Sequence, residues 1–135
     1  PGFLRAEEKM RAFMSADIYL NTNKIDNMPV TVVEACAVGM PVVSTDVGGI
    51  SDLIADGETG LLVPDDDEAE MSRKVFRLLE DAELAGKLSK NGRLLAERSA
   101  WTSVRKCWDQ VFAELTTSTR IQHTNASTDS VQTTS

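Results

Sequence analysis

Three short apolar runs, separated by segments with helical spacing, constrain the fold of this chain more than any other feature. The runs occupy residues 18–20, 42–45 and 61–63 and consist largely of β-branched or other aliphatic residues. Strands that alternate with helices pair in parallel through right-handed crossovers, and strands covered on both faces read as continuous apolar runs. We therefore predict an α/β fold built on a parallel sheet. Because a sheet averages about five or six strands, we expect its upstream part to be missing from this chain.

Helical spacing marks the segments between these runs. It predicts a helix over residues 6–15, a second from Pro29 to about Gly39, and a short third over residues 51–55. Proline suits the first turn of a helix, where its missing N–H would be unpaired in any case. In the second half, Asp67 is placed to cap a helix whose apolar face consists of Met71, Val75, Leu78 and Leu79.

Two more helices are expected before the composition changes. The first, interrupted near Asn91 and Gly92, is marked by Leu84, Leu88 and Leu95. The second carries an amphipathic face of Val104, Trp108, Val111, Phe112 and Leu115. Residues 116–135 then hold eleven Ser or Thr and almost no large apolar side chains, so burial cannot offset the entropy lost on ordering. We expect one domain over residues 1–115 and a disordered tail over residues 116–135.

Charge and composition exclude several functions. The formal net charge is −7, which disfavours binding to nucleic acid or to anionic lipid. No window approaches the roughly 20 apolar residues of a membrane-spanning helix, so we expect no transmembrane segment and a cytoplasmic protein. Cys36 and Cys107 fall in helical patterns without metal-ligand spacing. We expect both to be buried, reduced thiols.

The loops that follow the three predicted strands are the candidate functional region. In open α/β sheets, ligands bind at the carboxyl ends of the strands, where residues 21–29, 46–51 and 64–67 would meet. The first loop holds Asp26, and Glu34 lies one to two turns into the next helix. The amides that open a helix lack intrahelical partners and bind phosphate well. Here these amides are flanked by two acids that can accept hydrogen bonds from sugar hydroxyls. This combination predicts a nucleotide-sugar site.

Two stretches of sequence carry a family resemblance. They read DNMPVTVVEACAVGMPVVSTDVGG and DLIADGETGLLVP, and they match in order across loop, helix, strand and glycine pair. Together with residues from about 3 to 115, they resemble the family 4 glycosyltransferases (glycosyl transferases group 1), which have the GT-B fold of two facing Rossmann-like domains. The resemblance implies that this chain is the carboxyl-terminal, nucleotide-sugar-binding Rossmann-like domain, incomplete at its start.

The resemblance also implies roles for individual residues. Glu34 should bind the ribose hydroxyls of the nucleotide, and Asp26 should contact the donor sugar near the reacting carbon. Asp26 stands where the family usually has a glutamate, so its side chain is one methylene shorter. Backbone amide donors for sugar and phosphate are expected from Asn27, Met28, Val30 and Thr31, with Pro29 in the same substrate-binding segment, and close backbone approach to the ligand or acceptor is expected at Gly48 and Gly49. Asp26 as a helix cap and the glycine pair as a plain loop remain open alternatives.

The activity implied for the complete enzyme is transfer of a hexosyl-type sugar from a nucleotide diphosphate sugar to a hydroxyl acceptor, with retention, in polysaccharide biosynthesis. No cofactor or metal is expected, because helix amides and cationic side chains can stabilise the leaving diphosphate. The family's cationic residues and its amino-terminal, acceptor-binding domain would lie upstream of Pro1. We therefore expect weak donor binding and no turnover by this chain alone. Peripheral attachment to the inner membrane through the missing domain stays open.

Alternatives accompany these hypotheses. Lys24 could reach a phosphate, although a surface lysine is the simpler interpretation. The triplet Asp65, Asp66 and Asp67 could bind a metal, but a solvated helix cap fits its position better. At the level of function, the rivals are a GT-B-like nucleotide-sugar epimerase and a non-catalytic nucleotide-binding remnant.

Overall fold

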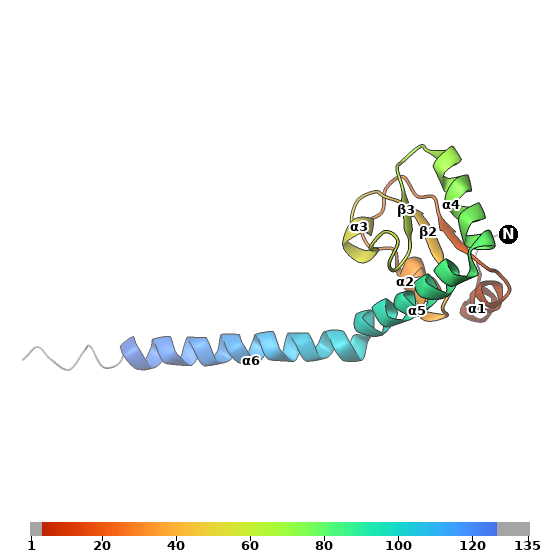
Figure 1. Cartoon of the computed structure of the whole chain (residues 1–135). Helices are drawn as coiled ribbons and strands as arrows, with labels where there is room; N and C mark the ends of the chain where they lie inside the picture. The colour runs from red at the N-terminus through yellow and green to blue at the C-terminus, as the bar shows by residue number, and fades with distance from the viewer. Residues whose placement is uncertain (1–3, 127–135) are drawn as a thin grey trace, which may run out of the picture. The chain divides into compact units, whose positions relative to one another are not determined.

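The chain forms two compact units, which are described separately. The computed structural model describes the backbone of residues 4–126, and the units are Pro1–Ser99 and Ala100–Ser135. The first unit carries the sheet, and helix α6 (Trp101–Ala126) lies in the second (Figure 1). The boundary between the units therefore falls before residue 115, where we placed the end of the folded domain.

The sheet contains three parallel strands in the described part of the chain. They are β1 (Tyr19–Asn21), β2 (Val42–Thr45) and β3 (Leu61–Val63), in the spatial order β1-β2-β3. Leu20 lies opposite Val43. Every residue of the central strand β2 is buried, because the strand has a neighbour on each side and helices on both faces. The predicted α/β class with a Rossmann-like parallel sheet is confirmed.

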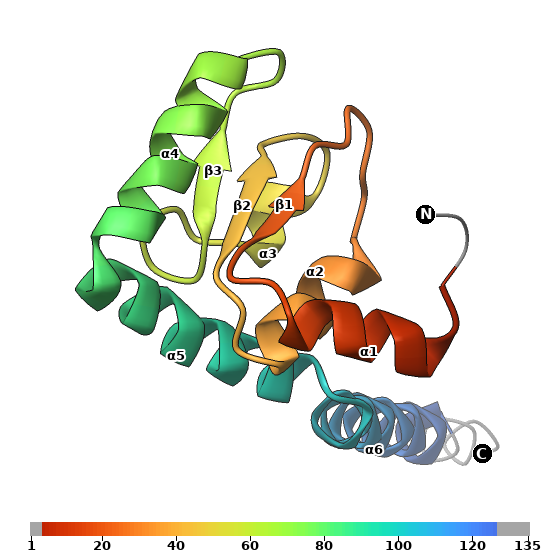
Figure 2. The same cartoon turned by 90° about the vertical axis from the view of Figure 1, so that its right-hand side faces the viewer.

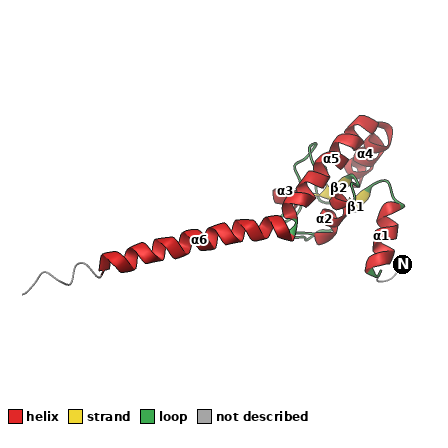
Figure 3. Ribbon diagram, turned by 90° about the horizontal axis from the view of Figure 1, so that it is seen from below, coloured by secondary structure: helices red, strands yellow, loops and turns green. Residues whose placement is uncertain are grey.

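Helices cover both faces of this sheet. Helix α2 (Val30–Ala37) lies on one side of the strands and α4 (Glu68–Glu80) on the other (Figure 3). Helix α5 (Ala82–Ser99) crosses the sheet at the end opposite the strand arrowheads and contacts both α2 and α4 (Figure 2). The other helices of this unit are α1 (Ala6–Met14) and the short α3 (Ile50–Leu53).

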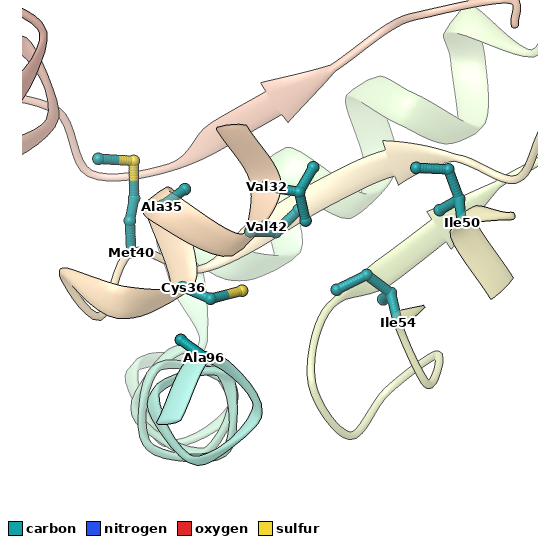
Figure 4. Close-up of a cluster of buried hydrophobic side chains, with 8 residues drawn as sticks. All are labelled: Val32, Ala35, Cys36, Met40, Val42, Ile50, Ile54 and Ala96. Atoms are coloured by element: carbon teal, nitrogen blue, oxygen red, sulfur yellow. The ribbon is translucent and has the colours of Figure 1, made fainter. Parts of the chain in front are cut away.

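Two apolar clusters fill the space between the sheet and these helices. Adjacent residues of a strand point to opposite faces, so Val42 enters one cluster and Val43 the other. The first cluster comprises Val32, Ala35, Cys36, Met40, Val42, Ile50, Ile54 and Ala96 (Figure 4). The second comprises Val43, Leu61, Val63, Leu78 and Leu88. Aliphatic side chains dominate both clusters, as the low aromatic content predicts.

Helix α1 is attached to the rest of its unit less firmly than the other long helices. None of its residues is fully buried. Phe13 packs against the first cluster, and its ring meets that of Tyr19 edge to face with centroids 5.8 Å apart. The second attachment is an ion pair between Lys9 and Glu34 of α2. This helix therefore touches the region in which the sequence places the functional residues.

Helix α5 is continuous, which corrects the predicted interruption near Asn91 and Gly92. Gly92 is buried against α2, and a Cβ on it would lie 3.4 Å from the Sγ atom of Cys36. The absence of a side chain lets the two helices approach closely, and this packing outweighs the cost of about 1 kcal/mol that glycine imposes inside a helix. Asn91 donates a side-chain hydrogen bond to the Glu58 carbonyl at 2.9 Å.

Helix α4 begins as predicted, but one of its expected core residues faces outward. The Asp67 carboxylate accepts a hydrogen bond from the amide of Glu70 at 2.8 Å, which caps the helix. Leu78 is buried, whereas 60% of Leu79 is exposed. Neighbouring residues point about 100° apart on a helix, so only one of this pair can face the sheet.

The second unit differs from the prediction in two respects. Helix α6 continues past Leu115 to Ala126, so the expected tail falls partly on this helix and partly on residues 127–135, which lie outside the described range. Cys107 is exposed, contrary to the expectation of two buried thiols, and so are Trp108 and Phe112, which stack on each other along the same helix. Among the helices described, none is long and apolar enough to span a bilayer.

Candidate functional site

The loops after the three strands lie at one edge of the sheet, as parallel pairing requires. Residues 22–29 follow β1, residues 46–49 follow β2, and residues 64–67 follow β3. The Asp46 amide donates to the Val63 carbonyl at 2.7 Å, which joins the start of the second loop to the end of β3. The predicted meeting of these loops at the carboxyl edge is therefore observed.

A buried polar cluster supports this edge from below. Asn21, Ser44 and Thr45 are the buried polar residues among those described, with exposed fractions of 3%, 0% and 7%. The Asn21 side-chain amide donates to the Ser44 hydroxyl at 3.1 Å, and that hydroxyl donates to the Thr45 carbonyl at 2.9 Å. Buried polar groups need such partners. Sequence reasoning placed Asn21 in the loop, since a polar residue at the end of a short apolar run gives no sign of burial.

This cluster also fixes the beginning of the first loop. The Thr45 hydroxyl donates to the Asn23 carbonyl at 2.6 Å. The Asn23 side-chain amide in turn donates to the Asp26 carboxylate at 2.8 Å. Asp26 is therefore oriented by its own loop and does not cap α2, because that helix has no side-chain cap. The alternative interpretation of Asp26 as a helix cap is wrong.

The glycine pair of the second loop packs directly against Asp26 and Asn27. The Gly49 amide donates to the Asp26 carbonyl at 3.1 Å. A Cβ on Gly48 would lie 1.9 Å from the Asp26 carbonyl oxygen, and one on Gly49 would lie 2.1 Å from the Asn27 carbonyl oxygen. Gly48 also has a φ of 57°, a conformation that side-chain-bearing residues rarely adopt. In this structure the glycines allow close approach of the two loops to each other.

The amino-terminal end of α2 is open. Pro29 is the N-cap residue and supplies no capping side chain. Within residues 4–126, the first amide of this helix to find an acceptor is that of Val32, which donates to the Pro29 carbonyl at 3.0 Å. The amides of Val30 and Thr31 precede it, and both residues are exposed, as is Met28. The helix dipole places about half a positive charge at this end. An anion can therefore bind here.

Glu34 is engaged by a residue that sequence reasoning missed. The Lys9 ammonium donates to both oxygens of its carboxylate, at 2.7 and 2.8 Å. The two side chains are 36% and 37% exposed. Lys9 lies 25 residues upstream, on another helix, and no local pattern pairs it with Glu34.

A separate cavity of about 260 Å³ opens between the first and third loops. Lys24 and Asp66 form an ion pair across it, and the Asp66 carboxylate raises the pKa of Lys24 through a hydrogen bond and its charge. The other lining residues are Thr22, Thr45, Pro64, Asp65, Asp67, Glu68, Met71 and Ser72. Neither Asp26 nor Glu34 lines this cavity. Each residue of the acidic triplet is engaged within the protein, because Asp65 accepts from the Asp66 amide and Asp67 caps α4.

The fold brings together part of the predicted site. Asp26 and Asn27 meet Gly48 and Gly49 at the carboxyl edge, beside the open end of α2, while Glu34 lies further along that helix against α1. A parallel sheet with helices on both faces and its loops gathered at this edge defines an α/β protein of the Rossmann-like class.

Comparison with known proteins identifies the family. Residues 1–95 match the model of the glycosyl transferases group 1, and the chain belongs to this family. It is 31% identical over 111 residues to the D-inositol 3-phosphate glycosyltransferase of Corynebacterium efficiens, covering 82% of this chain and 26% of that protein. The chain spans about a quarter of the length of such relatives.

Solved GT-B glycosyltransferases share the fold. Sucrose-phosphate synthase from Thermosynechococcus elongatus superposes with a TM-score of 0.75 at 27% identity, covering 87% of this chain and 30% of that one. Anabaena HepE in complex with UDP-glucose superposes with a TM-score of 0.69 at 23% identity, covering 85% of this chain and 31% of that one. These structures confirm the predicted resemblance to GT-B glycosyltransferases.

Proposed function

We propose that this chain binds the nucleotide diphosphate of a sugar donor, as the carboxyl-terminal part of a glycosyltransferase that transfers the sugar to a hydroxyl acceptor. The observation that carries the proposal is the open amino-terminal end of α2 beside Asp26. The amides of Val30 and Thr31 can donate to a phosphate oxygen, and the helix dipole favours negative charge at this position. Family membership and the UDP-glucose complex of HepE support this ligand class.

Asp26 is proposed to accept a hydrogen bond from the donor sugar. Its carboxylate is held by Asn23 and its backbone by Gly49, so it requires little reorganisation when a ligand arrives. The glycine pair contributes indirectly, by letting the second loop support Asp26 and Asn27 at close range. Glu34 is proposed to accept hydrogen bonds from the ribose hydroxyls. Each carboxylate oxygen has two lone pairs, so the Lys9 contact leaves acceptor capacity for the ribose.

Stabilisation of the leaving diphosphate would come from the α2 amides and from cationic groups outside this chain. A donor held at the helix end presents its phosphates to backbone donors that are already oriented. We propose retention of configuration and a hexosyl donor for the complete enzyme, and no turnover by this chain alone. Retention is supported by the match of Glu34 to the family motif, with Asp26 at the position where the family usually has a glutamate, and inactivity by the short span of the chain relative to its relatives.

A titration of the ¹⁵N-labelled chain with UDP, followed by NMR, tests this proposal, with GDP and ADP in parallel. The amide signals of Val30 and Thr31 should shift with saturable dose dependence. Glu34→Ala should raise the Kd about tenfold or more, as expected for losing a hydrogen bond to a charged group. Glu58→Ala is the matched control, because Glu58 also pairs with a lysine, Lys87 of α5, but is not part of α2 or of the proposed site.

The outcomes separate the candidate functions. Shifts confined to residues around the Lys24–Asp66 cavity, or no saturable shift with any of the three nucleotides, would contradict the proposed site. An unchanged Kd in Glu34→Ala would favour a nucleotide-binding remnant. Product analysis of the complete enzyme, free epimer against glycoside, would distinguish an epimerase from a transferase. Sustained sugar transfer by this chain alone would refute the expected lack of turnover.

A further inference from the structure

We infer that Lys9 is a positioning residue for Glu34, so that helix α1 takes part in nucleotide recognition. This inference rests on the proposed function, in which Glu34 binds the ribose. Both oxygens of the Glu34 carboxylate lie within 2.7 and 2.8 Å of the Lys9 ammonium. A single ammonium that contacts both oxygens restricts rotation of the carboxylate about its terminal bond. The direction in which the remaining lone pairs point is therefore set by Lys9.

The surroundings of Glu34 explain why such a partner is needed. Its side chain is a little over one-third exposed, and it lies on the helix whose open end is proposed to hold a diphosphate. A carboxylate without a counter-charge would be repelled by that diphosphate and would lose rotamer freedom when the ribose binds. Lys9 offsets the charge and orders the side chain before the ligand arrives. The ribose would then meet an acceptor that is already oriented.

The position of Lys9 is also fixed from outside the site. Phe13 lies one turn further along α1, on the same face of the helix. It packs on Tyr19 and on the first apolar cluster, which holds α1 against the sheet. Because α1 has no fully buried residue, the Phe13 contacts and the Lys9–Glu34 pair are its main attachments among those described. Lys9 therefore connects the packing of α1 to the orientation of a proposed ligand-binding carboxylate.

The test compares UDP with its 2′-deoxy and 3′-deoxy forms, by NMR titration or calorimetry of the chain. Wild type should bind UDP more tightly than at least one deoxy form, because Glu34 accepts from the missing hydroxyl. Lys9→Met should raise the Kd of UDP about fivefold and reduce this preference. Lys9→Arg should restore much of both. In a Glu34→Gln background, Lys9→Met should have little further effect on UDP binding.

Lys87→Met is the matched control, because Lys87 forms a comparable 2.6 Å pair with Glu58 across 29 residues. It should leave both affinity and preference unchanged. If Lys9→Met weakens UDP and its deoxy forms equally, Lys9 is merely structural and the inference is overturned. The inference is also overturned if Glu34→Ala weakens UDP binding but Lys9→Met does not. That outcome would leave the proposed function intact. If wild type shows no preference for the ribose hydroxyls, the proposed role of Glu34 fails and the inference fails with it.

Discussion

Gly48 lies so close to Asp26 that a Cβ at position 48 would stand 1.9 Å from the Asp26 carbonyl oxygen. The contact joins the loop after β2 to the loop that carries the proposed sugar-binding carboxylate. Gly48 also has a φ of 57°, so a side chain there would meet two separate penalties. The glycine pair is therefore part of the support for the first loop.

We expect Gly48→Ala to lower the free energy of unfolding by about 2 kcal/mol or more, because it adds a steric clash to an unfavourable φ. Two variants separate these causes. Gly57→Ala tests the φ penalty alone: Gly57 has a φ of 73°, but an added Cβ would meet nothing within 4 Å, so the variant should cost about 1 kcal/mol. Gly49→Ala tests the clash alone: Gly49 has an ordinary φ of −90°, but an added Cβ would lie 2.1 Å from the Asn27 carbonyl oxygen. Urea unfolding measures all three. If Gly48→Ala costs no more than Gly57→Ala, the two loops are not packed as described.

Gly86→Ala should stabilise the chain. Gly86 is an exposed residue of α5, and an added Cβ would meet nothing within 4 Å. Alanine is favoured over glycine inside a helix by about 0.5–1 kcal/mol, and the urea midpoint should rise accordingly. Gly92→Leu in the same helix should instead destabilise by roughly 1–3 kcal/mol, since it would overpack the contact with Cys36. A stabilising Gly92→Leu would show that α5 does not press against α2.

Asp67→Ala should cost about 1 kcal/mol of stability by removing the cap of α4. The Asp67 carboxylate accepts from the Glu70 amide at 2.8 Å, so its loss leaves a helix-end donor without that partner. Asp67→Asn should retain most of the stability, because an asparagine side chain caps equally well. The comparison uses chemical denaturation at constant salt. Equal losses in both variants would indicate that charge, and not the hydrogen bond, is what matters.

The two cysteines should react with a thiol reagent at very different rates. Burial raises the pKa of Cys36 to about 11 from 9.0, so at pH 8 its thiol is protonated as well as covered. Cys107 is exposed. Labelling the native chain with DTNB (5,5′-dithiobis-(2-nitrobenzoic acid)) at pH 8 should therefore release one equivalent quickly, and Cys107→Ser should abolish that phase. Rapid release of two equivalents from the native chain would contradict the burial of Cys36.

The same shift implies a pH dependence of stability. A thiol whose pKa is raised in the folded state holds its proton more tightly there than in the unfolded chain. Its contribution to stability is complete below pH 9 and falls as the pH rises toward 11. Wild type should therefore lose more unfolding free energy than Cys36→Ala between pH 8.5 and pH 10.5, values that lie roughly half a unit below the unfolded and the folded pKa. Parallel curves for the two proteins would contradict the shift.

Local pattern was enough to predict most elements of the fold. The strands predicted at residues 42–45 and 61–63 have the same bounds as β2 and β3. A short apolar run between turn signals is typical of a strand that is buried on both faces. The Asp67 cap could also be predicted from the sequence, because a cap acts within one helical turn. The interruption predicted in α5 was wrong because a glycine in a helical pattern does not show whether another helix packs on it.

The sequence by itself determined the class of fold, the family, and the segment from Asp26 to Glu34 as the candidate site, because these depend on residue order and short-range spacing. Only the tertiary structure decided that Gly48 supports Asp26, that Lys9 holds Glu34, and that Cys107 is exposed while Cys36 is buried. Each of the two contacts joins residues more than 20 positions apart, and burial depends on every element packed around a side chain. Neither these long-range contacts nor the burial of a side chain can be predicted from the local periodicity of a single sequence.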